Sequence, residues 1–392
     1  MKNKWKMLAL WLVTILMMAE GVFTVRANED THQTESLQLE APSALLMEPV
    51  TGQVLYEKNK DEVRSPASIT KIMTLILIFD ELEAGRLSMD EQVTTSSYAK
   101  SMGGSQVFLE EGEVQSVETL IKCIVIASGN DASVVMAERI AGSEAEFVKK
   151  MNQRAKELGM NHTHFEDCCG LTESENHYTT AYDVALMSRE LILKYPKILE
   201  YSSIWMEDIT HITAKGSSQF TLTNTNKLVR SFDGCQGLKT GSTSIAKYCV
   251  SAVAQKDKLQ LISVVMGAPD YKVRFADAGK MLHYGFNCYH IYRYEKHNHL
   301  KVPVKGTLLK VAECRMQRDF AFLLKKEDAD ADITAKVKWN KLQEAPVKKN
   351  ASAGKMEFYL GKEKIGEVPI VYQKTILRST YLEYLLYLIK AF

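Results

Sequence analysis

Residues 65–74 read SPASITKIMT, and a run of apolar residues follows them. Because residues three apart lie on one face of a helix, this stretch predicts a helix on which Lys71 stands beside Ser68. We expect Ser65 to cap this helix, Pro66 to take its first position and Ser68 to lie in its first turn. A serine hydroxyl is a good nucleophile at neutral pH only when a neighbouring base takes its proton. The stretch therefore makes Ser68 a candidate nucleophile and Lys71 its candidate base.

Two further short motifs follow in the chain, SGN at residues 128–130 and KTG at residues 239–241. A lysine acts as a base only if burial or another cation lowers its pKa, and Lys239 is the candidate second cation. Ser128 can relay a proton to the leaving group, and the amide of Asn130 can hold both the first lysine and the substrate backbone. Each motif alone is common in loops, turns and helix starts, but the three in this order predict one active site.

Six segments carry a resemblance to a known family: residues 65–74, 104–105, 126–132, 147–160, 224–227 and 237–241. On these segments the chain resembles the D-alanyl-D-alanine carboxypeptidases, low-molecular-mass penicillin-binding proteins of the serine peptidase type. The expected fold is α+β, with a β-lactamase/transpeptidase-like catalytic domain followed by a small β-rich C-terminal domain. In the catalytic domain we expect an antiparallel sheet with helices on both faces, together with a helical region.

The resemblance also implies a reaction. Ser68 forms an acyl-enzyme with the penultimate D-alanine of a peptidoglycan stem pentapeptide, the terminal D-alanine leaves, and water frees the shortened peptide. β-Lactams acylate the same serine. The family's oxyanion hole corresponds to the backbone N–H groups of Ser68 and Ser242, and Lys239 and Thr240 line the end of the site that receives the substrate carboxylate. Arg274 matches the family's carboxylate-binding arginine, with a surface salt bridge as the alternative.

The expected site therefore has two overlapping sets of residues. The candidate catalytic residues are Ser68, Lys71, Ser128, Asn130 and Lys239. The candidate substrate-binding residues are Lys239, Thr240, Gly241, Ser242 and Arg274.

Two positions depart from the family pattern. Residues 167–170 read DCCG where the family commonly has Asn-Pro-x-Gly, and Lys247 stands where it commonly has glycine. Both departures concern loop geometry and substrate preference beside the site, and neither removes a residue with an expected chemical role.

Two other functions stay open at this point. A class A-like β-lactamase shares the three motifs, but it has aspartate at the place of Gly129 and lacks an extra C-terminal domain. Glu166, Glu173 and Glu175 lie in the stretch where such an enzyme places its deacylating glutamate. A catalytically silent cell-wall binding protein is the other alternative, and the intact motif residues count against it.

Composition excludes several classes of protein. A chain of 392 residues exceeds one average domain, and a net charge of +1 without a basic stripe gives no argument for nucleic-acid binding. Seven cysteines show no Cys-x-x-Cys pair and no histidines at zinc-ligand spacing, so we expect no metal site and no cofactor. We expect mostly reduced thiols that act as small apolar residues, with a Cys235–Cys249 bridge as an open alternative.

The amino terminus has the pattern of a secretory signal over residues 1–27, with lysines before an apolar core at 7–18 and Val-Arg-Ala before Asn28. An uncleaved anchor is the alternative. A polar linker is expected over 28–40, the catalytic domain over 41–291 and the β-rich domain over 292–375. The apolar segment 376–392 predicts an amphipathic helix that binds the membrane surface, or else packs on its own domain. The protein is thus expected to be exported and to act in the cell wall, at the outer face of the cytoplasmic membrane.

Hydrophobic periodicity gives a coarse secondary structure. We expect a hairpin over 44–56 with Gly52 at its turn, and five further helices at 117–127, 132–141, 145–158, 181–193 and 276–284. Strands are expected at 220–222, 247–254 and 260–266. In the C-terminal part, residues 333–339 and 356–360 alternate as strands do, and the expected turn signals are Gly306, Pro346, Gly354, Gly361 and Gly366.

Overall fold

The computed structural model describes residues 37–213, 216–309, 311–328, 332–341 and 343–391, and its larger compact unit begins at Leu39. The predicted signal segment and most of the predicted linker lie outside the described residues.

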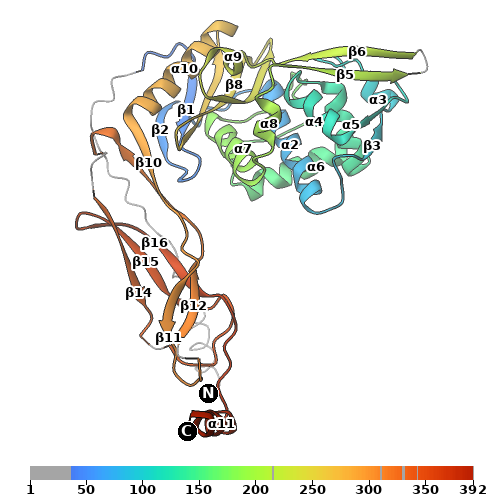
Figure 1. Ribbon diagram of the computed structural model, residues 1–392. Helices are drawn as coiled ribbons and strands as arrows, with labels where there is room; N and C mark the ends of the chain where they lie inside the picture. Colours follow the sequence, from blue (N-terminus) through green and yellow to red (C-terminus); the bar gives the residue numbers. More distant parts are fainter. Residues whose placement is uncertain (1–36, 214–215, 310, 329–331, 342, 392) are drawn as a thin grey trace, which may run out of the picture. The chain divides into compact units, whose positions relative to one another are not determined.

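A five-stranded antiparallel sheet organises the first part of this unit (Figure 1). Its strands lie in the order β2-β1-β9-β8-β7. Their bounds are β1 (Ser43–Met47), β2 (Val54–Lys58), β7 (Cys235–Thr243), β8 (Lys247–Lys256) and β9 (Leu259–Ala268). The first two strands form the predicted hairpin, and Gly52 between them has a φ of +75°, which favours glycine. The strands predicted at 247–254 and 260–266 are confirmed as β8 and β9.

Helices cover both faces of this sheet. Ser251 in β8 pairs with Val264 in β9, and Ser263 is the next residue of that strand. Because successive side chains of a strand point to opposite faces, Ser251 and Ser263 face opposite ways. The hydroxyl of Ser251 bonds to Ser188 of α7 (Ala181–Lys194), and that of Ser263 donates to a carbonyl of α10 (Tyr271–Cys288). The α+β class with helices on both faces is thereby confirmed.

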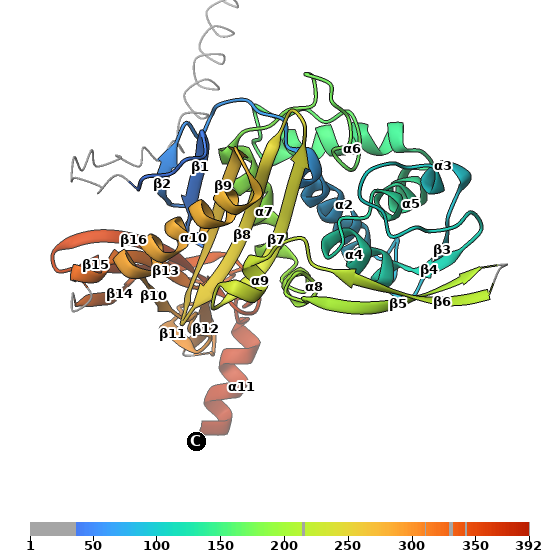
Figure 2. The same ribbon diagram turned by 90° about the horizontal axis from the view of Figure 1, so that it is seen from above.

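A helical region lies beside the sheet (Figure 2). Its helices are α2 (Lys71–Glu83), α3 (Ser97–Lys100), α4 (Val117–Val125), α5 (Asn130–Ala141), α6 (Glu144–Glu157) and α8 (Ile198–Ser202), whereas α9 (Leu228–Ser231) packs beside β7 of the sheet. Residues 71–79 of α2 are all buried, so this helix forms the centre of the core. The helices predicted at 117–127, 132–141, 145–158 and 181–193 are confirmed as α4 to α7. The helix predicted at 276–284 is longer, because Asp270 caps it and accepts two backbone N–H groups.

The start of the helix with the candidate nucleophile differs from the prediction. Residues Ala67–Thr70 form a 3-10 turn, η1, and the α-helix begins only at Lys71. Pro66 rather than Ser65 is the N-cap, without a side-chain hydrogen bond, and Ala67 has a φ of +47°. The expected cap at Ser65 is therefore wrong, although Ser68 and Lys71 keep their spacing of three.

In the first part of the chain four strands were not predicted: β3 (Gln92–Thr94), β4 (Val114–Ser116), β5 (Met206–Thr213) and β7. The strand predicted at 220–222 is the end of β6 (Gly216–Thr223), which pairs with β5. Most of β6 is exposed polar sequence, so only its end at 220–222 carried an apolar signal.

A second antiparallel sheet follows in the C-terminal part, in the order β11-β12-β16-β15-β14. Its strands are β11 (Leu300–Pro303), β12 (Val311–Met316), β14 (Ile333–Trp339), β15 (Ser352–Leu360) and β16 (Glu363–Tyr372). A separate pair joins β10 (Tyr289–Tyr294) to β13 (Phe320–Lys325), and η2 (Lys326–Asp328) follows it. The rings of Phe320 and Phe358 stack with centroids 3.8 Å apart in the core of this part. The predicted β-rich module is confirmed.

Two of the expected turn glycines lie inside strands. A Cβ at Gly354 would lie 2.5 Å from the Lys338 carbonyl oxygen, and one at Gly366 would lie 2.5 Å from the Phe320 ring. Glycine therefore stands at these two positions because atoms of the neighbouring strands approach closely, not because the chain turns there. The expectation of turns at Gly354 and Gly366 is wrong. Gly361, with a φ of +58°, does lie at a turn.

The last helix is α11 (Tyr381–Ala391). It begins later than the predicted segment 376–392, because Ile376 still pairs with Val347 of the β-rich part. Thr380 and Glu383 bond to each other's backbone N–H groups at its start, which is a capping box. All residues of the helix are exposed. In the described parts of the chain, no helix has the length and apolarity needed to span a bilayer.

Candidate active site

Ser68 and Lys71 lie at the junction of η1 and α2. The Nζ atom of Lys71 is 3.0 Å from Ser68 Oγ, 2.6 Å from Asn130 Oδ1 and 2.8 Å from the Cys169 carbonyl oxygen. Lys71 is fully buried, whereas Ser68 is partly exposed. The hydroxyl is therefore open to a substrate while its amine neighbour is shielded from water.

Asn130 is held from both sides at the start of α5. Its Nδ2 group donates to the Gly103 carbonyl oxygen at 2.7 Å, which turns Oδ1 toward Lys71. A Cβ at Gly104 would lie 2.8 Å from that Nδ2, so this loop approaches the amide closely. The orientation of the Asn130 amide is thus fixed before any substrate binds.

A second pair consists of Ser128 and Lys239. Lys239 Nζ donates to Ser128 Oγ at 2.9 Å and to the Thr240 carbonyl oxygen at 3.0 Å. Ser128 precedes α5 with a φ of +64°, and Lys239 belongs to β7. Both side chains are buried. The Thr240 hydroxyl bonds to the Thr225 hydroxyl at 2.7 Å, which fixes the neighbouring residue of the strand.

The strand with the third motif passes directly beside the turn with the first. A Cβ at Gly241 would lie 2.7 Å from the Pro66 carbonyl oxygen and 3.0 Å from the backbone nitrogen of Ser68. Only glycine permits this approach. The next residue, Ser242, is exposed at the open side of β7.

Arg274 lies in the first turn of α10. Its Nη1 group donates to the carbonyl oxygens of Gly241 and Cys249 at 3.1 and 3.3 Å, and its guanidinium carbon lies 5.5 Å from the centre of the Tyr248 ring. Arg274 is buried, and its Nε atom finds no partner among the described residues. The alternative of a surface salt bridge is therefore wrong.

The three buried cations have altered acidities. Burial lowers the pKa of Lys71, although nearby acidic groups oppose the shift. Burial also lowers the pKa of Lys239 well below its ordinary value, and the positive charges of Lys71 and Arg274 add to that effect. Burial lowers the pKa of Arg274 as well. The site thus favours the neutral form of lysine more than water does.

The loop at residues 167–170 takes part in this arrangement. The Asp167 carboxylate accepts backbone N–H groups of residues 169–172, and Thr74 of α2 donates to the Cys168 carbonyl oxygen. A Cβ at Gly170 would lie 1.8 Å from the Ala67 carbonyl oxygen. The departure from the family pattern therefore leaves a tightly held loop that supplies a carbonyl to Lys71.

The second departure from the family pattern is the lysine at position 247. Lys247 begins β8 with a φ of +55°, in the region where glycine is favoured. Its side chain is exposed, so it does not enter the site.

Sequence reasoning missed several residues that hold the site. They include Gly103 and Cys169, which act through backbone carbonyls, and Thr225, which acts through its hydroxyl. His177 is another: its Nδ1 accepts the Glu166 N–H, so its Nε2 carries the proton toward Thr70 Oγ1, 2.8 Å away. Thr225 lies in the family-like segment 224–227 and Cys169 in the departing segment 167–170, but neither residue type indicated its role, and backbone carbonyls carry no signal in the residue type.

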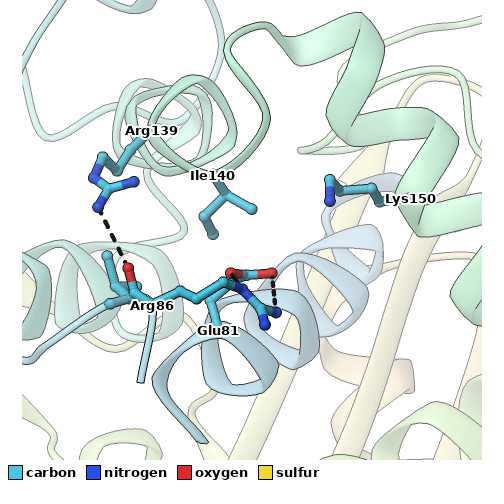
Figure 3. A pocket seen from close by; sticks show the side chains of 6 residues that line it. Glu81, Arg86, Arg139, Ile140 and Lys150 are labelled. Atoms are coloured by element: carbon cyan, nitrogen blue, oxygen red, sulfur yellow. Dashed lines mark hydrogen bonds and ion pairs between the residues drawn. The ribbon is translucent and has the colours of Figure 1, made fainter. Parts of the chain in front are cut away.

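A cavity elsewhere serves as a contrast. Figure 3 shows Glu81, Arg86, Arg139, Ile140 and Lys150 around it. It contains none of the candidate site residues, and Arg86 bonds to Glu81 within it.

Comparisons with known proteins agree with the resemblance. The family model described as D-alanyl-D-alanine carboxypeptidase matches residues 28–270, and that described as penicillin-binding protein 5, C-terminal domain, matches residues 299–378. The chain is 41% identical to D-alanyl-D-alanine carboxypeptidase DacF of Bacillus subtilis (strain 168), over 95% of this chain and 94% of the relative. It is 33% identical to DacA of Escherichia coli (strain K12), over 85% and 83% of the two chains.

Solved structures extend the agreement to the fold. Penicillin-binding protein 5 from Haemophilus influenzae superposes with a TM-score of 0.72 at 28% identity, covering 87% of this chain and 98% of the other. D-alanyl-D-alanine carboxypeptidase DacD from Francisella tularensis gives a TM-score of 0.67 at 27% identity, covering 92% and 99%. Because the three motifs form one site and the matches cover nearly the whole chain, the chain belongs to the D-alanyl-D-alanine carboxypeptidase family.

Proposed function

We propose that this protein removes the terminal D-alanine from peptidoglycan stem pentapeptides through an acyl-enzyme on Ser68, and that β-lactams acylate the same hydroxyl. The observation that carries this proposal is the contact of 3.0 Å between Ser68 Oγ and the buried Lys71 Nζ. The activity named for the relatives fits this geometry, because peptide-bond cleavage needs an activated nucleophile at an open position.

Lys71 is the base. A neutral amine has two N–H groups and one lone pair. Asn130 Oδ1 and the Cys169 carbonyl oxygen accept two N–H groups, so the lone pair is left for the Ser68 hydroxyl. The lowered pKa of Lys71 favours this neutral form. Proton transfer to Lys71 then accompanies attack of Ser68 Oγ on the carbonyl carbon of the penultimate D-alanine.

Ser128 and Lys239 return a proton on the other side of the site. Lys239 Nζ donates to Ser128 Oγ at 2.9 Å, so the Ser128 hydroxyl can give its proton to the leaving D-alanine nitrogen while it takes a proton from Lys239. Asn130 holds Lys71 and offers its amide to the substrate backbone. The residues we assign to catalysis are thus Ser68, Lys71, Ser128, Asn130 and Lys239.

The developing oxyanion is received by backbone N–H groups of Ser68 and Ser242. The close approach of Gly241 to the Ser68 nitrogen supports this assignment, because it brings the end of β7 beside the nucleophile. Preorganised donors of this kind typically contribute about 3–4 kcal/mol to lowering the barrier.

The substrate's free carboxylate is received by Lys239, Thr240 and Arg274. Arg274 is buried, no carboxylate partner is found for it among the described residues, and it bonds to the Gly241 carbonyl oxygen; these observations support this role. Buried cations are costly unless an anion meets them, and the substrate supplies that anion. We assign substrate binding to Lys239, Thr240, Gly241, Ser242 and Arg274.

We further propose an exported protein with a signal at 1–27, a linker at 28–40, a catalytic domain at 41–291 and a β-rich domain from 292. The exposed apolar side chains of α11, such as Tyr381 at 83% and Ile389 at 64% exposure, support contact with a membrane surface. The enzyme then works at the outer face of the cytoplasmic membrane. Truncation after Ser379 followed by cell fractionation tests this, and unchanged membrane association contradicts it.

The central experiment compares two substrates. We expect labelled penicillin to form a long-lived adduct and diacetyl-Lys-D-Ala-D-Ala to release D-alanine, with both reactions lost in Ser68→Ala. Fast turnover of the antibiotic instead indicates a class A-like β-lactamase. Absence of both label and D-alanine release indicates a catalytically silent cell-wall binding protein.

A further inference from the structure

The loop beside Lys71 carries a cluster that the proposed reaction does not use. Cys168 and Cys169 are fully buried, and Glu144, the first residue of α6, is partly exposed beside them. One ligand atom from each of the three residues lies within 4.8 Å of the other two. Among the described residues, no other group of three histidine, cysteine or acidic side chains meets this condition.

We propose that Glu144, Cys168 and Cys169 bind a soft divalent cation of the zinc class, with a fourth position open to water. Two thiolates and one carboxylate are ligands that Zn²⁺ takes in tetrahedral sites. Zn–S and Zn–O bond lengths place tetrahedral donor atoms roughly 3.5–3.8 Å apart. The cluster therefore needs to contract by only about 1 Å. Binding replaces the two thiol protons, which pass to the solvent.

The surroundings of Glu144 fit a ligand. The Cys168 N–H donates to Glu144 Oε1 at 3.0 Å, and the Tyr98 hydroxyl donates to Oε2. Hydrogen bonds of this kind orient a ligating carboxylate, and each oxygen still has a free lone pair. Tyr98 is half exposed, so the carboxylate connects the surface with the buried thiols.

Binding of the cation has a measurable consequence of its own. A thiol binds a metal as the thiolate, so protons of Cys168 and Cys169 are released when the cation binds.

Binding of a cation at this cluster affects Lys71 through the backbone of Cys168 and Cys169. The Cys169 carbonyl oxygen accepts a hydrogen bond from Lys71 Nζ at 2.8 Å, and the Cys168 carbonyl accepts one from Thr74. A contraction of the two thiols around a cation moves these carbonyls. Cation binding therefore changes the rate of Ser68 acylation, a consequence that rests on the proposed function.

The sequence predicted no metal site because it shows no Cys-x-x-Cys pair. Glu144 lies 24 residues before Cys168, and only the fold brings it to the adjacent thiols. This separation explains why ligand spacing along the chain gave no signal.

The test uses the purified full chain, reduced and stripped of metal, and Cd²⁺ as the probe. We expect the ultraviolet thiolate-to-Cd²⁺ band to saturate at one ion per chain, with protons released, and Zn²⁺ to displace the Cd²⁺. The double variant C168S/C169S loses the band, whereas the matched double variant C235S/C288S keeps it. A band that persists without Cys168 and Cys169, or that disappears with the matched variant, overturns the site.

A second variant guards against misfolding. Glu144→Gln keeps the size of the side chain and an oxygen for Tyr98, and we expect it to weaken Cd²⁺ binding about 10- to 100-fold. Unchanged affinity in this variant also overturns the proposal. Penicillin labelling of each metal-free protein is measured separately, so that absent labelling contradicts the proposed function while absent Cd²⁺ binding contradicts only the metal site.

Discussion

Three buried cations of the site and two arginines at another cavity differ in their surroundings. Lys71, Lys239 and Arg274 are buried, and the partners found for them are hydroxyl, amide and carbonyl oxygens. Around the cavity of Figure 3, Arg86 pairs with Glu81 and Arg139 pairs with Glu91.

The difference shows in the acidities. Burial lowers the pKa of Lys71 and Lys239, whereas the hydrogen bond to Glu81 raises that of Arg86. A carboxylate partner keeps a cation charged and accepts its hydrogen bonds. A surface arginine that is paired in this way therefore needs no substrate to explain its presence. Buried cations without such partners are costly to fold, and they become useful when a substrate brings the missing charge or takes the missing proton.

The largest effect is expected at Lys71. Lys71→Ala removes the base and leaves Ser68 as an ordinary hydroxyl, so acylation by labelled penicillin should fall about 10³-fold. Single-exponential labelling kinetics measure this rate. Loss smaller than tenfold, in a protein that unfolds like the wild type, means that another group takes the proton.

Lys239→Gln tests the second buried cation. The amide can still bond to Ser128 but carries no charge for the leaving group or the substrate carboxylate. We expect kcat/KM for the peptide to fall about 10²-fold, as for loss of one preorganised electrostatic group. An unchanged rate contradicts the part assigned to the pair of Ser128 and Lys239.

The pH dependence of acylation reports on the same lysines. Only neutral Lys71 accepts the proton, so the rate rises with pH until pH exceeds the pKa of Lys71. Because burial lowers that pKa, the rise should end below the pH range in which an exposed lysine titrates. On the acid limb the rate changes about tenfold per pH unit. A limb that ends at the ordinary lysine pKa contradicts a buried base.

The comparison also shows what sequence can predict. The spacing of Ser68 and Lys71 is local, so a helical repeat was enough to place them together even though the turn is a 3-10 turn. The pairs Lys71–Asn130 and Lys239–Ser128 are long-range, and they could be predicted only because three motifs with complementary chemistry occur in one chain.

Other parts of the site and fold could not be predicted, for physical reasons. The Cys169 carbonyl that binds Lys71 is a backbone group, and every residue type has one. Most of β6 is exposed polar sequence, so only its end at 220–222 was predicted, and β5 buries only Ile209 and His211, too few apolar residues to mark it as a strand. The glycines at 354 and 366 reflect what lies across the sheet rather than local turns, and only the fold shows their neighbours.

Arg274→Ala separates binding of the peptide from acylation by antibiotics. The variant loses a charged hydrogen-bond donor for the terminal carboxylate, so KM for the peptide should rise about tenfold. Penicillin labelling should change less than the peptide reaction. The opposite pattern, with labelling lost and KM unchanged, means that Arg274 instead supports the strand through Gly241 and Cys249.

The smallest effect is expected at the cavity of Figure 3, where Arg86→Gln removes the pair with Glu81. The Arg86 side chain is 64% exposed, and exposed ion pairs contribute little to stability because water and salt screen them. We therefore expect an unchanged midpoint of thermal unfolding, unchanged penicillin labelling and unchanged release of D-alanine. Arg86 is the matched control for Arg274, since both variants lose one guanidinium group. If Arg86→Gln slows the peptide reaction as much as Arg274→Ala does, burial without a carboxylate partner does not distinguish functional cations in this protein.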